Sequence, residues 1–134
     1  EGVVSLANAL HSNGKLQRLV LKGNKVGDQG AIAIGTMLKH NNALQTIDLS
    51  SCSIGHDGGV AIGHGLAENT ALEHLILDSN SLGFGNDTSL FSVGVSTNNV
   101  LNTLRLSGNG FDATGDGGSL PLGVILAHVK SEAI

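Results

Sequence analysis

One cysteine and six histidines are the residues of this sequence that could most readily bind a metal ion or act as nucleophiles. Metal-binding motifs place such residues at short, fixed spacings, as in H-x-x-x-H or C-x-x-C, and neither spacing occurs here. The histidines are spread over predicted helix ends, a turn, an exposed helix face and a strand: His11, His40, His56, His64, His74 and His128. We therefore expect no metal site and no cofactor.

Two glycine-rich segments share only part of the pattern of a ligand-binding loop. Asp112 and Asp116 stand in a loop that lacks the third ligand residue and the closing glutamate of a calcium-binding loop. Residues 55–59 precede a predicted helix but lack the lysine of the phosphate-binding G-x-x-x-x-G-K-[ST] motif, so we expect their glycines to serve a tight turn. Since no motif predicts catalysis, we expect that the protein is not an enzyme.

The amino-acid composition argues against some classes of binding partner. The chain has 134 residues, a formal net charge of -4, seven basic residues and neither Trp nor Tyr, which argues against nucleic-acid binding through phosphate contacts or base stacking. No segment approaches the roughly 18 continuous apolar residues of a membrane helix. A single cysteine excludes an intramolecular disulfide and favours a reducing compartment. We expect a cytoplasmic protein, with cytoskeletal or ciliary association left open.

A repeated nine-residue segment determines the predicted fold. Four copies of the pattern L-x-x-L/I-x-L-x-x-N/C begin at Leu16, Leu44, Leu72 and Leu101, so the period is 28, 28 and 29 residues. In this pattern the central L-x-L part forms a short strand and the last residue closes a turn. The turn residues are Asn24, Cys52, Asn80 and Asn109. Because Cys52 occupies a position that accepts Asn or Cys, we interpret it as a buried structural thiol rather than a nucleophile.

The second half of each repeat has the periodicity of a helix. Apolar residues recur at steps of three and four, which places them on one helix face. They are Val3/Leu6/Leu10, Ala31/Ile34/Leu38 and Thr88/Phe91/Val95, with weaker matches at Gly59/Ile62/Leu66 and Ser119/Leu122/Leu126. A second asparagine column precedes the repeats, at Asn13, Asn41, Asn69 and Asn98. We expect these asparagines to end each helix in a left-handed conformation.

These features together resemble the ribonuclease-inhibitor class of leucine-rich repeats, which also occurs in NOD-like receptors, Ran GTPase-activating proteins and axonemal proteins. The resemblance implies an α/β fold: a right-handed solenoid in a horseshoe arc, with parallel strands on the concave face and helices on the convex face. We expect a single domain over 1–134, with a partial first repeat 1–15 and repeats 16–43, 44–71, 72–100 and 101–134, as part of a longer array. The fourth repeat departs from the pattern, with three extra residues and Val129 in place of the helix-ending Asn.

Alternation along the strands predicts which side chains face outward. Three columns on the concave face follow: Arg18/Thr46/His74/Thr103, Val20/Asp48/Ile76/Arg105 and Lys22/Ser50/Asp78/Ser107. The surface is basic near Arg18 and Lys22 and acidic near Asp48 and Asp78, which would complement a charged partner. The concave face is therefore the predicted contact surface for a protein partner.

Function is less determined than fold, since one fold serves many partners. The favoured hypothesis is a non-catalytic protein-binding or scaffolding module within a larger intracellular protein or assembly. The alternative is a GTPase-activating or NOD-like-receptor-type sensing domain, although no functional residue of the GTPase activators can be carried over, because Arg18 and Arg105 lie on predicted strands. Inhibition of a secreted ribonuclease is disfavoured by the single Cys and the absence of Trp.

Overall fold

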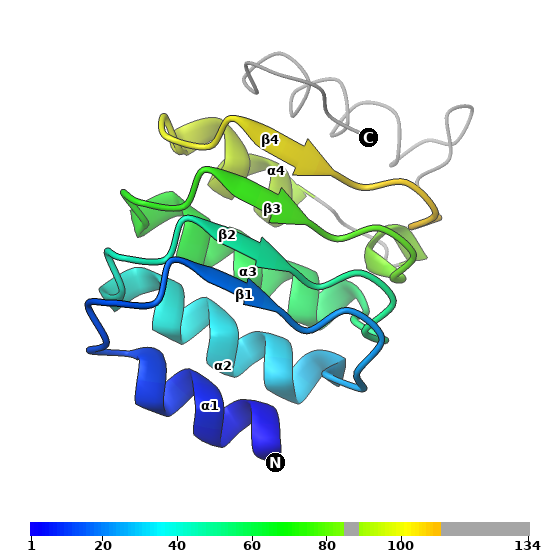
Figure 1. Cartoon of the computed structure of the whole chain (residues 1–134). Helices are drawn as coiled ribbons and strands as arrows, with labels where there is room; N and C mark the ends of the chain where they lie inside the picture. Colours follow the sequence, from blue (N-terminus) through cyan, green and yellow to red (C-terminus); the bar gives the residue numbers. More distant parts are fainter. Residues whose placement is uncertain (85–88, 111–134) are drawn as a thin grey trace.

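The computed structural model describes residues 1–84 and 89–110, and over these residues helices and strands alternate along the chain (Figure 1). The elements are α1 (Gly2–Leu10), β1 (Arg18–Val20), α2 (Gly27–His40), β2 (Thr46–Asp48), α3 (His56–Glu68), β3 (His74–Ile76), the 3-10 helix η1 (Leu82–Phe84), α4 (Ser89–Thr97) and β4 (Thr103–Arg105). The α/β fold predicted from the repeats is confirmed. None of the helices in these two stretches is long and apolar enough to cross a bilayer.

The four short strands form one parallel sheet in the order β1-β2-β3-β4. Neighbouring strands pair in the register of the sequence repeat, so that Leu19 lies beside Ile47, Ile47 beside Leu75, and Leu75 beside Leu104. A parallel connection needs a crossover, and α2, α3 and α4 each supply one by running back along the same side of the sheet (Figure 1). The helices thus cover one face of the sheet. We refer to the opposite face, which no described element covers, as the outer face.

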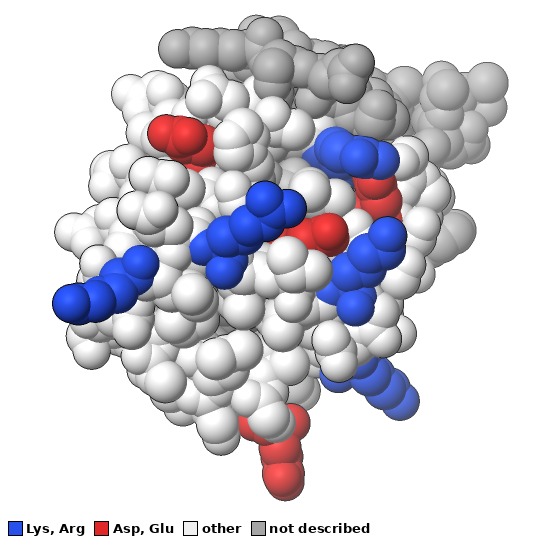
Figure 2. Space-filling view, in the orientation of Figure 1, with Lys and Arg blue, Asp and Glu red and all other residues white. Residues whose placement is uncertain are grey.

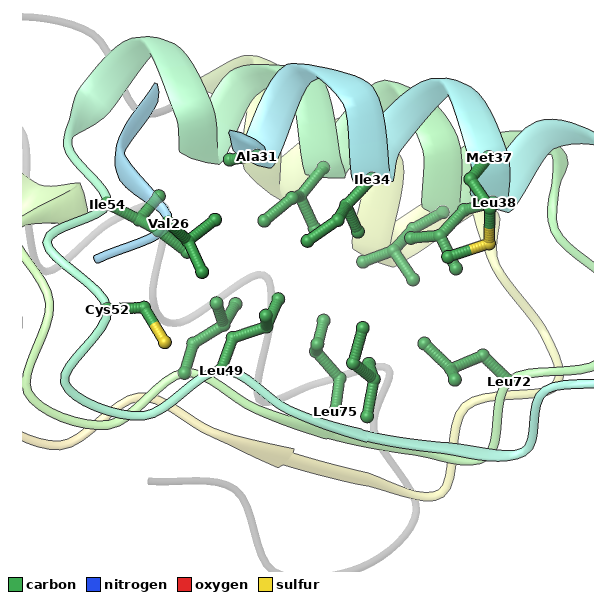
Figure 3. Packing of buried hydrophobic residues seen from close by; sticks show 14 of the residues in the cluster. Val26, Ala31, Ile34, Met37, Leu38, Leu49, Cys52, Ile54, Leu72 and Leu75 are labelled. Carbon is green, nitrogen blue, oxygen red and sulfur yellow. The ribbon is translucent and has the colours of Figure 1, made fainter. Parts of the chain in front are cut away.

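The core lies between the sheet and the helices (Figure 3). Leu49, directly after β2, and Leu75 in β3 face helix residues such as Ile34 and Leu38, and all four are buried. Burying a side chain of this size contributes roughly 1.5–3 kcal/mol, so the core is the main source of stability. In and directly after β1, however, the predicted inward-facing Leu19 and Leu21 are only partly buried.

The asparagines at the helix ends do not adopt the predicted left-handed conformation. Asn41 and Asn69 are indeed the residues that end α2 and α3, but their backbones are extended, with φ/ψ of -79°/129° and -78°/138°. For these two residues the predicted position was correct and the predicted conformation was wrong. For Asn13 the position was wrong as well, because α1 ends at Leu10 and His11 is its C-cap residue. Both side chains are buried, and their hydrogen bonds explain the choice of residue.

Each of these buried amides joins two consecutive repeats. The Nδ2 group of Asn69 donates to the carbonyl oxygens of Leu38 at 2.8 Å and Asn41 at 3.1 Å in the preceding repeat. Its Oδ1 atom accepts the backbone N–H groups of Ala71 at 2.9 Å and Leu72 at 2.7 Å in the turn toward β3. The same four-bond pattern recurs at Asn41 and Asn98. We call Asn41, Asn69 and Asn98 the asparagine ladder.

Glycines allow the helices to approach one another closely. A Cβ atom on Gly35 of α2 would lie 2.3 Å from the carbonyl oxygen of Ala61 in α3, far inside van der Waals contact. The glycines of residues 55–59 were expected to form a turn, but Gly58 and Gly59 lie within α3 and are buried against side chains of neighbouring repeats. That expectation was wrong for these two residues, whose small size serves packing between repeats.

Several predictions fall outside the described residues. They concern the Asp112/Asp116 loop, the helix pattern Ser119/Leu122/Leu126, the three extra residues of the fourth repeat, Val129, His128 and Thr88.

Candidate protein-binding surface

Strand pairing assembles the predicted columns on the outer face. Arg18, Thr46, His74 and Thr103 occupy one set of paired positions, and Val20, Asp48, Ile76 and Arg105 occupy the next. The third column, Lys22, Ser50, Asp78 and Ser107, lies two residues beyond the second, where the strands have ended. Strand pairing therefore brings residues that are 28 or 29 positions apart next to one another across the sheet.

Ser50 differs from the expectation that this column is exposed. Only 5% of its surface is accessible. Its backbone N–H and its hydroxyl both donate to Oδ1 of Asp48, at 3.0 and 2.7 Å. The pair forms a local turn that closes the end of β2. Ser50 therefore holds the Asp48 carboxylate in place and is not accessible to a partner.

Asp78 connects the third repeat to the fourth. Its Oδ1 atom accepts the backbone N–H of Ser107 at 3.0 Å and the hydroxyl of the same residue at 2.9 Å. Its Oδ2 atom lies 2.7 Å from Nη2 of Arg105, and only 15% of the Asp78 side chain is exposed. The charge of Arg105 is thus largely neutralised by its neighbour. The negative charge of Asp78, which the sequence assigned to the acidic middle of the surface, is therefore also largely neutralised.

The end of the outer face at β1 has a different character. Arg18, Val20 and Lys22 are all exposed, and Val20 has 54% of its surface accessible. Neither Arg18 nor Lys22 forms an ion pair with any residue of 1–84 or 89–110. The space-filling view, drawn in the orientation of Figure 1, shows several basic side chains standing out on this face (Figure 2). These are the groups of the face best placed to meet a partner.

Turn residues behind the third column form a second set of hydrogen bonds between repeats, which we call the turn ladder. The side-chain amide of Asn80 donates to the carbonyl oxygens of Leu49 and Leu77, at 2.8 and 2.9 Å, and its Oδ1 accepts the N–H groups of Cys52 and Ile54. Asn109 makes the equivalent donor bonds to the third and fourth repeats. Asn24 is exposed and bonds only within its own turn, to Leu21 at 3.0 Å.

Cys52 takes the place of asparagine in this ladder and is fully buried. Its Sγ atom lies 3.2 Å from the carbonyl oxygen of Leu21 in the first repeat, where an asparagine would place its amide, and 3.3 Å from that of Ser50. Burial raises the pKa of the thiol, which outweighs the lowering by the backbone of Asn24 and Gly23. The site keeps the group as a neutral thiol and so disfavours the reactive thiolate.

The histidines do not converge on a metal site within the residues that the structure describes. His11 and His40, at the ends of α1 and α2, stack on each other with their ring centroids 4.2 Å apart. His56 is the first residue of α3 rather than part of a turn, and His64 is exposed on the same helix. Over 1–84 and 89–110, no three His, Cys, Asp or Glu side chains form a group that could hold a metal ion.

Comparison with known proteins identifies related folds. Residues 12–35 and 40–63 match the family described as Leucine Rich repeat. The solved structure of actin-binding site 2 of leiomodin-1 is 25% identical in sequence, with a TM-score of 0.73 over 94% of this chain and 70% of that one. The C-terminal domain of tropomodulin from Caenorhabditis elegans, 14% identical, has a TM-score of 0.57 over 97% and 92% of the two chains and shows the fold alone. No curated protein sequence matches this chain.

Proposed function

We propose that this chain, which is a leucine-rich repeat protein, is a non-catalytic binding module of the ribonuclease-inhibitor-like class that holds a protein partner against the outer face of its sheet. The observation that carries the proposal is the uncovered face itself. Side chains from four repeats stand side by side there, and helices fill the other side of the sheet. An extended solenoid surface of this kind is a common way to bind another protein.

The partner that deserves the first test is actin, or a protein of the actin cytoskeleton. Support comes from leiomodin-1, whose similar structure is that of an actin-binding site. That similarity extends over 94% of this chain. It also supports the cytoskeletal association that the sequence left open.

Two matched variants test which face binds. Ile76→Arg places a long charged side chain at the centre of the outer face, where Ile76 is half-buried in β3. Ile32→Arg makes the same change on α2, where Ile32 is 40% exposed on the helical side. Co-sedimentation with actin filaments, and pull-down with actin monomers, would be measured for the unmodified chain and both variants, after circular dichroism has shown that they are folded.

We expect Ile76→Arg to lose most of the binding and Ile32→Arg to keep it. The opposite result would move the contact surface to the helices. No binding of either form of actin would remove the actin proposal, and affinity purification from the native source, followed by mass spectrometry, would then test for another protein partner. Failure to recover any partner that distinguishes the two variants would contradict the binding function.

A further inference from the structure

We propose that the basic end of the outer face, formed by Arg18, Val20 and Lys22 with Lys15 and Lys25 in the adjoining loops, binds an acidic segment of the protein partner. This inference rests on the proposed function and specifies the chemistry of the partner. It concerns one end of the surface only. We call these five residues the basic end.

Charge is distributed very unevenly between the repeats. Lys15, Arg18, Lys22, Lys25 and Lys39 are five of the seven basic residues, and they all lie in residues 15–39. In contrast, no Lys or Arg occurs between 40 and 104, a stretch that contains six acidic residues: Asp48, Asp57, Glu68, Glu73, Asp78 and Asp87. Residues 15–39 are therefore strongly basic although the whole chain has a net charge of -4.

Nearby carboxylates do not neutralise the basic end. Asp28, the single acidic residue between positions 2 and 47, directs its Oδ1 at the start of α3, where it accepts the backbone N–H groups of Gly55 at 2.7 Å and Gly58 at 3.1 Å. Asp48, on the neighbouring strand, accepts two hydrogen bonds from Ser50. Neither carboxylate lies within ion-pair distance of a basic side chain.

The other basic side chains described by the structure, unlike those of the basic end, form ion pairs. Lys39 lies on the helical side and pairs with Glu68 at 3.9 Å, and Arg105 pairs with Asp78 at 2.7 Å. By contrast, the four cations of the basic end are exposed and form no ion pair with any described residue. Unpaired cations gathered on one surface attract an acidic partner and orient it as it approaches.

The shape and surroundings of the basic end favour a short acidic protein segment over a long polyanion. Val20 stands between Arg18 and Lys22 with 54% of its surface exposed, so the site offers an aliphatic contact as well as charge. A nucleic acid that ran along the outer face would meet the carboxylates of the second and third repeats, beginning with Asp48. The complementary ligand has a few carboxylates beside an aliphatic side chain.

A labelled peptide of alternating glutamate and valine residues provides the probe. Its binding to the whole 134-residue chain would be measured by fluorescence anisotropy, in low and in physiological salt. The key comparison is Lys22→Glu with Lys39→Glu, which change the net charge equally but on opposite sides of the molecule. The double variant Arg18→Glu/Lys22→Glu tests the whole site, with circular dichroism confirming the fold of each protein.

We expect Lys22→Glu to weaken peptide binding by about fivefold or more and the double variant by more than about twentyfold, whereas Lys39→Glu changes it by less than about twofold. Binding should also weaken as salt is added, since exposed charges are screened. Equal losses for Lys22→Glu and Lys39→Glu would show an effect of net charge alone and would overturn the proposal. So would tighter binding of an oligonucleotide or of phosphatidylserine vesicles than of the peptide.

A different role for the cations would also overturn the proposal. Basic side chains on an open sheet edge keep it from pairing with other chains. If Arg18→Gln/Lys22→Gln causes self-association in sedimentation experiments and leaves peptide binding unchanged, the cations protect β1 and do not bind a partner. The proposed function and the acidic partner can be contradicted by different results. A native partner that Ile76→Arg loses and Arg18→Glu/Lys22→Glu retains would preserve the binding module and refute the acidic partner.

Discussion

At the scale of single residues, buried side-chain amides join the repeats. Asn69 has four hydrogen bonds to backbone groups, which satisfy carbonyl oxygens of one helix end and N–H groups of the turn that follows. Those backbone groups have no other partner in regular secondary structure. Leaving buried polar groups unpaired destabilises a protein by roughly 1–3 kcal/mol for each group.

Replacing Asn69 tests this role. We expect Asn69→Ala to lower the free energy of unfolding by about 2–4 kcal/mol in urea denaturation, because several buried backbone groups lose their partner. Asn69→Gly should be as damaging as Asn69→Ala, since the backbone at Asn69 is extended and gains nothing from glycine. The exposed Asn42, which follows Asn41 in the preceding repeat, provides the control, and Asn42→Ala should have little effect. Recovery of stability in Asn69→Gly would support the left-handed helix end instead.

Cys52 shows that a thiol can replace only part of an asparagine. Its Sγ atom reaches the carbonyl of Leu21 as an amide would, but it has no second atom to accept the N–H groups of the preceding turn. There, the N–H groups of Val26 and Gly27 bond instead to the backbone carbonyl of Cys52 itself. The turn thus has a conformation that suits a cysteine.

Thiol reactivity measures the burial of Cys52. Because burial raises the pKa of this thiol, the native chain should react with a thiol-specific reagent much more slowly than the chain in urea at the same pH. A raised pKa in the folded state also means that Cys52 stabilises the fold at neutral pH and that this contribution is lost as the pH rises through the folded-state pKa. The unfolding free energy should therefore fall in alkaline solution more for the unmodified chain than for Cys52→Ala. Rapid labelling of the folded chain would contradict the burial.

At the scale of elements, glycine sets the spacing of the helices. Helices α2 and α3 approach so closely that the carbonyl of Ala61 occupies the space of a Cβ atom on Gly35, and Gly65 of α3 meets the carbonyl of Gly35 in the same way. Gly94 of α4 has the same relation to Gly63 of α3. Backbone cannot move aside as a flexible side chain can, so a methyl group at any of these positions forces two repeats apart.

Gly35→Ala should therefore be destabilising even though alanine is the better helix former. Alanine usually stabilises a helix interior by up to about 1 kcal/mol relative to glycine, but overpacking at this contact should cost about 1–3 kcal/mol. Gly2→Ala in α1 is the matched control, because nothing lies within 4 Å of its Cβ position. Thermal denaturation should show a lower melting temperature for Gly35→Ala only. A rise in both variants would mean that the helices can separate without loss.

At the scale of the whole molecule, each repeat contacts its neighbours, so stability accumulates along the array. Leu77, directly after β3, is fully buried. We expect Leu77→Ala to lower the unfolding free energy by about 2–5 kcal/mol, a large share of the total for a domain of this size. The exposed Val20 in β1 supplies the control, and Val20→Ala should change stability by less than about 0.5 kcal/mol. A small loss for Leu77→Ala would be incompatible with the core described above.

The sequence by itself was enough to predict the fold. Four copies of one pattern at a constant spacing predict the strands, their register and the burial of the leucines, because residues at the same position in successive repeats must stack on each other. The structural role of Cys52 followed from the same alignment. Residues such as Arg18 and Asp48 could be assigned to the outer face on alternation alone, whereas their role in binding is still a prediction.

The contacts between repeats could be identified only from the tertiary structure. Neutralisation of Arg105 by Asp78 and the close contact of the helices at Gly35 depend on which groups of different repeats come within ion-pair or van der Waals distance. Sequence alternation tells which side of a strand a residue faces, but not what meets it there. The charge that the outer face offers to a partner therefore depends on the folded structure. An ion pair neutralises a cation, and the sequence alone does not show which cations are paired.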